Sequence, residues 1–566
     1  MKYLLCLLSM MFLLSELKAQ PIYFNWVKQI GGTGDDMGSS IAIDNFGNTY
    51  STGNFKGTLD FDPGPGIINL TSKGASDIFI LKLDASGNLV WAKQMGGNLD
   101  DAGASITIDN LGNIYLTGIF KDKVDFDPNS GVFNLISKGG DDIFILKLTL
   151  SGNFIWAKQI GGVSFQICHD ITTDRYGNVL TTGEFSKTTD FDPGVDSFNY
   201  TTQFGNGLFV SKLDSSGKFL WAKKFEGIAW NQSISITTDL SDNVFFTGDF
   251  GAELDFNPGP GVFKLTTLPD SFDIFICKLN PLGNFVWAKQ IGGTAFSMGA
   301  SIISDKSGYI LTTGFFRGKV DFDPHVSKTN YLSANSKGYG SFISKLDSFG
   351  NFVWAKQLGG DEDVTGSSIK IDGSGNIYSV GTYTGIEDFD PGTGVFNLQS
   401  NGYDAYVSKL DPSRNFIWAK NLGGSAQTGI NDFVLDEFGN IYSAGYFKEE
   451  TDFNPDSESF NLTSNGGFDI FIHKLGKNSL KINQGKDKSF LKIYPNPNNG
   501  IVNISFEKLT NNGHLKVFNI HGQTIIENNN VNEKTLTVDI SNQKNGIYFI
   551  EVSDNHNLSI LRFVKN

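Results

Sequence analysis

Seven of the eight tryptophans recur at a nearly constant spacing along the 566-residue chain. Their neighbours repeat with them, as in NLVWAKQMGG, NFIWAKQIGG and NFVWAKQLGG. The members of the series lie 65, 65, 65, 66, 67 and 64 residues apart: Trp26, Trp91, Trp156, Trp221, Trp287, Trp354 and Trp418. A fixed period of this size means that one supersecondary unit is copied along the chain, so the repeat constrains the fold more than any other feature. Only Trp230 stands outside the series.

Within one repeat, apolar residues alternate with polar ones, which predicts β-strands. The alternation is clear in IAI, TYSTG, IFILKL and LVWAK of the first full unit. Two connections, 44–48 (DNFGN) and 84–88 (DASGN), combine Asx and glycine residues as hairpin turns do. Four antiparallel strands per repeat make one blade of a β-propeller. The excess over the usual ~40–50 residues of a blade lies between the second and third strands, where INLTS (68–72) could form an extra edge strand.

The number of repeats predicts how the propeller closes. Seven segments have the pattern of an inner strand: SIAID, SITID, DITTD, ISITTD, SIISD, SIKID and DFVLD. The chain opens with an unaccompanied outer strand at 23–30, and the last repeat stops at 475 without a tryptophan strand. We therefore expect an all-β, seven-bladed propeller whose N-terminal strand completes the last blade and leaves no open sheet edge.

The repeated motifs resemble those of a known family. They are Φ-D-F-D-P-G-x-G-x-F-N-L, S-x-G-x-x-D-I-F-I-x-K-L-D and G-N-x-x-W-A-K-Q-x-G-G, and they extend over residues 22–475. In these motifs the chain is similar to the SBBP family of bacterial β-propeller repeats. The resemblance implies a seven-bladed propeller on an exported bacterial protein and does not imply a reaction.

The N-terminal segment has the features of a secretory signal peptide. Lys2 precedes an apolar run from Leu4 to Leu14, which is too short to span a bilayer, and Ala19 precedes Gln20 at the expected cleavage point. Removing residues 1–19 leaves 43 basic and 59 acidic residues, a net charge of −16. An acidic chain without basic blocks argues against nucleic acid as a partner. No later segment reaches 18 apolar residues, so we expect no transmembrane segment in the exported protein.

The C-terminal region differs from the repeats. Residues 476–488 are polar and predict a linker. Residues 489–566 contain short strands separated by turn signals, which predicts a small β-sandwich. This region is similar to the type A C-terminal sorting domain of the type IX secretion system, through Tyr494, Pro495, Asn496, Pro497, Gly500, Gly546 and Tyr548. The resemblance implies the type IX secretion machinery as a partner, and localisation outside the cell or on its outer surface.

Each long insertion carries two acids, or an acid and an asparagine, spaced by one residue. Side chains at this spacing in an extended segment point the same way, and two carboxylates with loop carbonyls are ligands that Ca²⁺ takes. The alternative is that each acid caps the turn before the following proline. The fully acidic pairs are Asp60/Asp62, Asp125/Asp127, Asp190/Asp192, Asp321/Asp323 and Asp388/Asp390.

The loops that lead into the inner strands differ between repeats in an organised way. In some repeats they carry acids, among them Asp36 and Asp101, and in three consecutive repeats they carry aromatic and amide side chains. Aromatic side chains beside amides suit sugar rings or peptide side chains, whereas packing between blades is the alternative. The candidate ligand-binding residues are Asp36, Asp101, Phe165, His169, Trp230, Asn231, Gln232 and Phe296.

Motifs of enzymes are missing from the sequence. The six histidines lack metal-ligand spacing, and neither a G-x-S-x-G elbow nor a phosphate-binding loop occurs. Cys168 and Cys277 are predicted to be packed thiols. The sequence therefore favours an exported, non-enzymatic module that binds a glycan or a protein. An extracellular glycan- or peptide-acting enzyme and a structural surface-layer protein are the alternatives.

Overall fold

The computed structural model describes residues 22–325, 327–335, 337–477, 491–495, 498–506, 513–519, 523–531, 535–553 and 558–565. Within these ranges every regular element is a β-strand. The predicted signal peptide (1–19) and most of the predicted linker (476–488) lie outside the described residues. The chain divides into two compact units, Met1–Lys477 and Asn478–Asn566.

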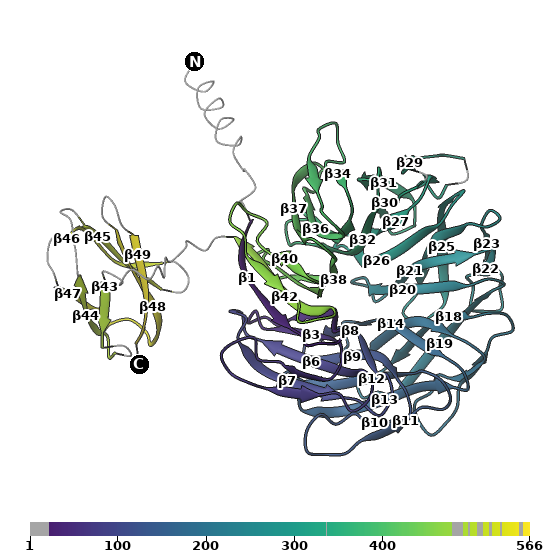
Figure 1. The fold of residues 1–566 in the computed structure, drawn as a ribbon, viewed down its shortest axis with the longest axis horizontal. Helices are drawn as coiled ribbons and strands as arrows, with labels where there is room; N and C mark the ends of the chain where they lie inside the picture. Colours follow the sequence, from purple (N-terminus) through teal and green to yellow (C-terminus); the bar gives the residue numbers. More distant parts are fainter. Residues whose placement is uncertain are drawn as a thin grey trace. The chain divides into compact units, whose positions relative to one another are not determined.

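The first unit consists of four-stranded antiparallel sheets, each named here by its innermost strand. The innermost strands are β2 (Met37–Ile43), β8 (Ala102–Ile108), β14 (Gln166–Thr173), β20 (Asn231–Thr238), β26 (Ser297–Ser304), β32 (Val364–Ile371) and β38 (Thr428–Leu435). The second strands are β3 (Thr49–Phe55), β9 (Asn113–Phe120), β15 (Val179–Phe185), β21 (Val244–Gly251), β27 (Ile310–Phe316), β33 (Ile377–Tyr383) and β39 (Ile441–Phe447). The sheets lie around a common centre, with β8, β14, β20, β26, β32 and β38 nearest to it (Figure 1).

The outer half of each sheet carries the repeated tryptophan. The third strands are β6 (Asp77–Leu83), β12 (Asp142–Thr149), β18 (Gly207–Leu213), β24 (Phe272–Leu279), β30 (Gly340–Leu346), β36 (Asp404–Leu410) and β42 (Asp469–Lys477). The outermost strands are β7 (Leu89–Met95), β13 (Phe154–Gly162), β19 (Phe219–Gly227), β25 (Phe285–Gly293), β31 (Phe352–Leu358), β37 (Phe416–Gly424) and, in the β38 sheet, β1 (Ile22–Ile30). Strand β1 pairs antiparallel with β42, as the unaccompanied N-terminal strand predicted.

The insertions form the extra strands that INLTS suggested. Each is a hairpin of two three-residue strands, and four of the hairpins pair with the outermost strand of the preceding sheet. The hairpins are β4/β5 (Thr58–Asp60, Asn69–Thr71), β10/β11 (Lys123–Asp125, Asn134–Ile136), β16/β17 (Thr188–Asp190, Asn199–Thr201), β22/β23 (Glu253–Asp255, Lys264–Thr266), β28/β29 (Lys319–Asp321, Tyr331–Ser333), β34/β35 (Ile386–Asp388, Asn397–Gln399) and β40/β41 (Glu450–Asp452, Asn461–Thr463).

The repeated tryptophans hold neighbouring sheets together. The Trp26 ring lies against Gly87, in the turn between the third and fourth strands of the β2 sheet, where a Cβ would come 3.0 Å from the indole. That glycine has φ of +79°, which disfavours any side chain. Trp156 of the β8 sheet donates from Nε1 to the Ser215 carbonyl of the β14 sheet, 3.2 Å away. The periodic tryptophans are therefore part of the scaffold.

Both remaining thiols are packed, as the sequence predicted. Cys168 and Cys277 are buried and unpaired. Burial raises the pKa of the Cys168 thiol to about 12, which keeps it protonated and unreactive.

The second unit is a small sandwich of two antiparallel sheets. One sheet has the order β43-β44-β47 (Leu491–Tyr494, Ile501–Phe506, Thr535–Asp539), and the other has the order β46-β45-β48-β49 (Thr524–Val531, Gly513–Asn519, Gly546–Ser553, Leu558–Lys565). Side chains from both sheets, such as Ile504 and Ile550, share one core. The described part of the chain contains no helix with the length and apolar character that crossing a membrane requires.

Candidate functional site

Two of the candidate ligand-binding acids, Asp36 and Asp101, bind the backbone of their own loops. Asp36 and Asp101 are fully buried. Asp36 accepts hydrogen bonds from the backbone amides of Gly32 (2.9 Å) and Lys56 (2.8 Å), and Asp101 accepts them in the same way from Gly97 and Lys121. Burial raises the pKa of each carboxyl to about 6. In each of these loops the acid that faces solvent is the preceding residue, Asp35 or Asp100.

The two predicted amide side chains, Asn231 and Gln232, also differ in burial. Asn231 is fully buried, accepts from the Asn206 side chain at its carbonyl, and donates from Nδ2 to the Ala229 carbonyl at 2.7 Å. Gln232 is half-buried. Of this predicted pair, only Gln232 can meet a ligand without rearrangement of the loop.

Phe165 and Trp230 come together as a stacked pair. Their ring centroids are 6.0 Å apart and their planes differ by 28°. Trp230 is 47% exposed, so part of the indole face is available to a ligand. Phe165 leads into β14 and Trp230 into β20, so the pair bridges two adjacent sheets. The structure thus unites two of the predicted residues in one exposed aromatic surface.

Phe296 belongs to a second aromatic group, one sheet further on. Its ring lies 5.7 Å from Phe272 and 5.9 Å from Phe315, and Tyr339 lies 5.1 Å from Phe315. The guanidinium carbon of Arg317 stands 4.3 Å from the centroid of Tyr339. Sequence reasoning found Phe296 and missed Arg317, although arginine occupies this position of the repeat only once.

His169 lies at the irregularity in strand β14 between Cys168 and Asp170. Its Nε2 is 3.7 Å from Oε1 of Glu184, whose side chain is only 1% exposed. Asn206 also reaches Glu184, at 3.4 Å. His169 thus meets an acid of the neighbouring strand, which no sequence motif indicated.

The first acid of each insertion pair caps its own turn. Asp60 Oδ1 accepts from the backbone amides of Asp62 (3.0 Å) and Ile68 (2.8 Å), and so closes the loop between the two strands of its hairpin. The first acids of the other fully acidic pairs make the corresponding bonds: Asp125, Asp190, Asp321 and Asp388. Turn capping, the alternative to calcium binding, therefore accounts for why these acids recur.

The second acid of each pair also accepts from a nearby backbone amide, two residues further along the chain. The Oδ1 atoms of Asp62, Asp192 and Asp390 each accept at 2.8 Å from the glycine amide at that position. Asp127 and Asp323 make the same bond at 3.0 Å, to the amides of Asn129 and His325. Both acids of a pair are thus occupied in turn geometry.

This arrangement differs from the metal-ligand role that the sequence suggested for these pairs. Across the described ranges, no group of three or more His, Cys, Asp or Glu side chains has metal-site geometry. The predicted calcium ligands that cap turns in this way are Asp60, Asp62, Asp125, Asp127, Asp190, Asp192, Asp321, Asp323, Asp388 and Asp390. The physical reason is that an aspartate two residues before a free backbone amide satisfies that amide locally and needs no ion to do so.

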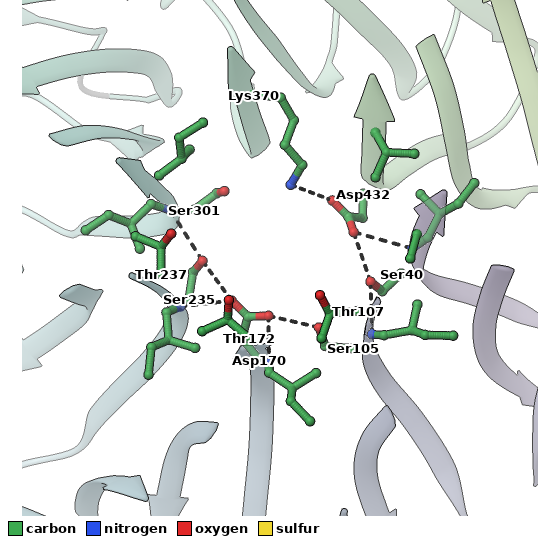
Figure 2. A pocket seen from close by; sticks show the side chains of 18 of the residues that line it. Ser40, Ser105, Thr107, Asp170, Thr172, Ser235, Thr237, Ser301, Lys370 and Asp432 are labelled. Atoms are coloured by element: carbon green, nitrogen blue, oxygen red, sulfur yellow. Dashed lines mark hydrogen bonds and ion pairs between the residues drawn. The ribbon is translucent and has the colours of Figure 1, made fainter. Parts of the chain in front are cut away.

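The inner strands line a central cavity of about 470 Å³ (Figure 2). Its walls are serine, threonine and isoleucine side chains, with Asp170, Lys370 and Asp432 as the charged groups. None of the eight predicted ligand-binding residues lines it, although His169 precedes Asp170. Seven side chains at equivalent positions of the inner strands form one layer: Ser40, Ser105, Asp170, Ser235, Ser301, Ser368 and Asp432.

Hydrogen bonds run from sheet to sheet through this layer (Figure 2). Asp170 accepts from Ser105 Oγ (2.8 Å) and Ser235 Oγ (3.0 Å), which belong to the sheets on either side of it. Asp432 accepts in the same way from Ser40 Oγ (2.9 Å) and Ser368 Oγ (3.0 Å). Backbone amides make the other links, from Ile106 to Ser40, Ile302 to Ser235 and Ile369 to Ser301. We name these seven side chains the hydroxyl–carboxylate layer.

The sorting-domain residues lie at the ends of the strands of the sandwich. Tyr494 ends β43 and is 49% exposed, whereas Tyr548 in β48 is buried and donates to the Lys544 carbonyl at 2.5 Å. Gly500 has φ of +108° and its carbonyl accepts from the Ile540 amide at 2.7 Å. Gly546 opens β48, and Pro495 follows Tyr494. Asn496 and Pro497 lie outside the described residues.

Two family models match the chain. A model described as a β-propeller repeat, SBBP, matches residues 25–54, 90–118, 155–184 and 353–389. A model described as a secretion system C-terminal sorting domain matches residues 492–566. The chain carries SBBP β-propeller repeats and a type IX C-terminal sorting domain. The sorting domain implies secretion or placement at the outer surface, and contact with the type IX machinery.

Similarity to individual proteins is more distant. The SBBP-repeat chain is 23% identical over 502 residues to an uncharacterized WD repeat-containing protein of Acanthamoeba polyphaga mimivirus, covering 75% of this chain and 36% of that protein. It is 28% identical over 172 residues to the regulatory protein FlaEY of Caulobacter vibrioides, covering 29% of this chain and 17% of FlaEY. The chain therefore spans about a third or less of the length of either relative.

Solved structures resemble the chain weakly. A protein of unknown function from Bacteroides caccae has 11% identity and a TM-score of 0.29, with 58% of this chain and 93% of that chain covered. The extracellular domain of a putative one component system from B. thetaiotaomicron has 11% identity and a TM-score of 0.22, with 94% and 81% covered. Scores this low carry no argument about function.

Proposed function

We propose that the repeats form a closed seven-bladed propeller, exported by the type IX system, that acts outside the cell as a non-enzymatic module binding a glycan. Three contacts between the first and last repeats support closure. Strand β1 pairs with β42, Ser40 donates to Asp432, and the Asp36 amide donates to the Phe468 carbonyl at 2.7 Å. Closure gives the loops a rigid support, and binding groups concentrate on such loops.

The exposed stacked pair Phe165–Trp230 carries the proposal for binding. Trp230 is the one tryptophan outside the periodic series, and the residue is 47% exposed. A partly exposed aromatic face binds the apolar face of a sugar ring through dispersion and the hydrophobic effect. Glutamine at 232, which is half-buried, adds a hydrogen-bonding amide beside it.

The loops that lead into the inner strands, which we call together the loop face, also carry acids in other sheets. Asp35, Asp100, Asp361 and Glu362 are exposed in the loops of the β2, β8 and β32 sheets. The loop face is therefore acidic in one part and aromatic in another. A protein ligand with basic and apolar groups, a glycan-acting enzyme and a surface-layer role remain alternatives that the same experiment separates.

Binding to an immobilised glycan array tests the proposal, with wild type compared with Trp230→Ala. A matched control is Leu240→Ala, which removes another large, 71% exposed side chain from the turn between β20 and β21. Loss of an aromatic platform costs roughly 1–3 kcal/mol in comparable stacking on bases, so we expect binding by Trp230→Ala to be about fivefold to a hundredfold weaker and binding by Leu240→Ala to be unchanged.

Three results would contradict this function. Turnover of a polysaccharide would favour the enzyme, and loss of turnover in Glu184→Gln would place the reaction at the His169–Glu184 contact. Capture of a protein with no glycan signal would favour a protein ligand. Equal glycan binding by wild type and Trp230→Ala would move the site away from the stacked pair. Repeating the array with a chelator tests whether calcium contributes.

A further inference from the structure

Arg317 has no acidic partner among the described residues, although the protein as a whole is acidic. It follows β27 directly, and its backbone amide donates to the Phe296 carbonyl at 3.1 Å. Its guanidinium lies over the Tyr339 ring at 4.3 Å. Nε is buried and has no hydrogen-bond partner in the described structure. A buried donor without an acceptor is unfavourable, so this guanidinium retains the capacity to bind an acceptor that the chain itself does not supply.

In one other sheet, the cation at the equivalent position has a carboxylate partner. Lys121 follows β9 as Arg317 follows β27, and its ammonium forms a 3.0 Å ion pair with Asp141, the residue before β12. In the β26 sheet the residue before β30 is Tyr339 instead of an acid. The fold thus builds a cation–carboxylate pair at this position of the β8 sheet, whereas in the β26 sheet the carboxylate is replaced by an aromatic ring.

The β38 sheet shows that the ring alone does not require arginine. There Lys448 follows β39 and stands 5.5 Å from the Phe468 ring, which precedes β42. Lysine is a point charge, whereas arginine presents a planar set of donors that matches a carboxylate with two parallel hydrogen bonds. The carboxylate of Asp363 accepts a hydrogen bond from the Tyr339 backbone amide at 3.1 Å, and no ion pair joins it to Arg317 in the described structure.

We propose that Arg317 binds a carboxylate of the ligand, so that the glycan recognised by the loop face contains uronic acid residues. The inference rests on the proposed function and names its ligand class. The guanidinium lies over the Tyr339 ring, which packs against Phe315, and Phe315 packs against Phe296. A sugar bound beside this aromatic group would present its carboxylate to the donors of Arg317. The guanidinium then gains the anionic partner that Lys121 finds within the chain.

Two polysaccharides with the same backbone separate charge from sugar recognition. Polygalacturonate carries a free carboxylate on each residue, and highly methyl-esterified pectin carries the uncharged ester in its place. In 0.15 M salt, long-range charge effects are screened beyond about 8 Å, so a difference between the two reports a local contact. We expect wild type to bind polygalacturonate at least tenfold more tightly than the ester.

Three variants locate the contact. Arg317→Gln removes the donor set, so it should weaken polygalacturonate binding about tenfold or more and leave the ester unchanged. Tyr339→Asp supplies an internal carboxylate like that of Asp141 but also removes a ring, so it should weaken the binding of both polysaccharides. Lys319→Gln is the matched control, because it removes one positive charge two residues away, where the ammonium lies over Tyr331. Its binding should stay within twofold of wild type. Circular dichroism checks that each variant is folded.

The outcomes separate this inference from the proposed function. If Arg317→Gln binds polygalacturonate as wild type does while Trp230→Ala loses glycan binding, the carboxylate contact is refuted and the glycan-binding function stands. If Lys319→Gln weakens binding as much as Arg317→Gln does, the effect is general charge and the inference is again refuted. If wild type binds neither polysaccharide nor any arrayed glycan, both fall together.

Discussion

Removing Asp432 should weaken the contact between the first and last repeats more than any single serine of the hydroxyl–carboxylate layer. Its carboxylate accepts from Ser40 Oγ, Ser368 Oγ and Lys370 Nζ at 2.9, 3.0 and 3.2 Å. It also accepts from two backbone amides, one of them at 2.8 Å. Asp432→Ala removes the shared acceptor of these donors, although Lys370 Nζ also donates to Ser368 Oγ at 3.2 Å. Because the open cavity lets water replace part of the loss, we expect a cost of about 3 kcal/mol in unfolding free energy.

Urea unfolding followed by tryptophan fluorescence measures this cost. All eight tryptophans lie between residues 26 and 418, so the signal reports the repeats and not the sorting domain. Ser301→Ala is the control, since Ser301 accepts a single 3.4 Å bond from the Ile369 amide, and its loss should cost about 0.5 kcal/mol. Hydrogen exchange should speed up in β1, β42 and β2 of Asp432→Ala. Equal stability of the two variants, or exchange that rises evenly in all sheets, would refute the reasoning.

Three further predictions concern the scaffold. Trp91→Ala should cost about 2–3 kcal/mol, because its half-buried ring packs in the core between sheets, whereas Trp230→Ala should cost less than about 1 kcal/mol in the same urea assay. Gly87→Ala should destabilise more than Gly57→Ala: both have positive φ, but a Cβ meets the Trp26 indole and the end of the Lys28 side chain only at the first, so the difference in melting temperature reports those contacts. Burial raises the pKa of the Asp36 carboxyl to about 6, so its contribution to the free energy of unfolding is complete below about pH 4 and is lost as the pH rises through 6. Asp36→Asn should flatten that part of the stability–pH curve. An unchanged curve would show that the buried Asp36 carboxyl does not cause the pH dependence.

The arrangement of strands could be predicted because the repeat contains its own evidence. Alternating residues such as those of DIFILKL give β6, and the Asx–glycine turns give its connections. The unaccompanied strand around Trp26 predicted the pairing of β1 with β42. By contrast, the pairing of four insertion hairpins with the preceding sheet depends on contacts between repeats, and no pattern within one repeat encodes those contacts.

The candidate site was less predictable, because burial depends on the position of a residue within its loop. Asp35 and Asp36 are neighbours of the same chemistry, yet the first is exposed and the second is fully buried, where two backbone amides bind it. The stacking of Phe165 on Trp230 could be predicted only as proximity of two loops. Glu184 lies on β15 and contacts His169 through the pairing of β14 with β15. The spacing of residues along the sequence does not reveal a contact of this kind.

Departure from the repeat is not by itself a sign of function. Asp170 and Asp432 replace the serine found in the equivalent sheets, but each accepts hydrogen bonds from the sheets on both sides, so their difference serves the scaffold. Trp230 and Arg317 also depart from the repeat, and they differ in what remains unsatisfied: an exposed indole face in one and a buried donor without an acceptor in the described structure in the other. A ligand-binding residue in a repeat protein is therefore best sought where a departure from the repeat coincides with an unmet interaction. A departure from the repeat can stabilise the fold, whereas a buried donor without an acceptor does not.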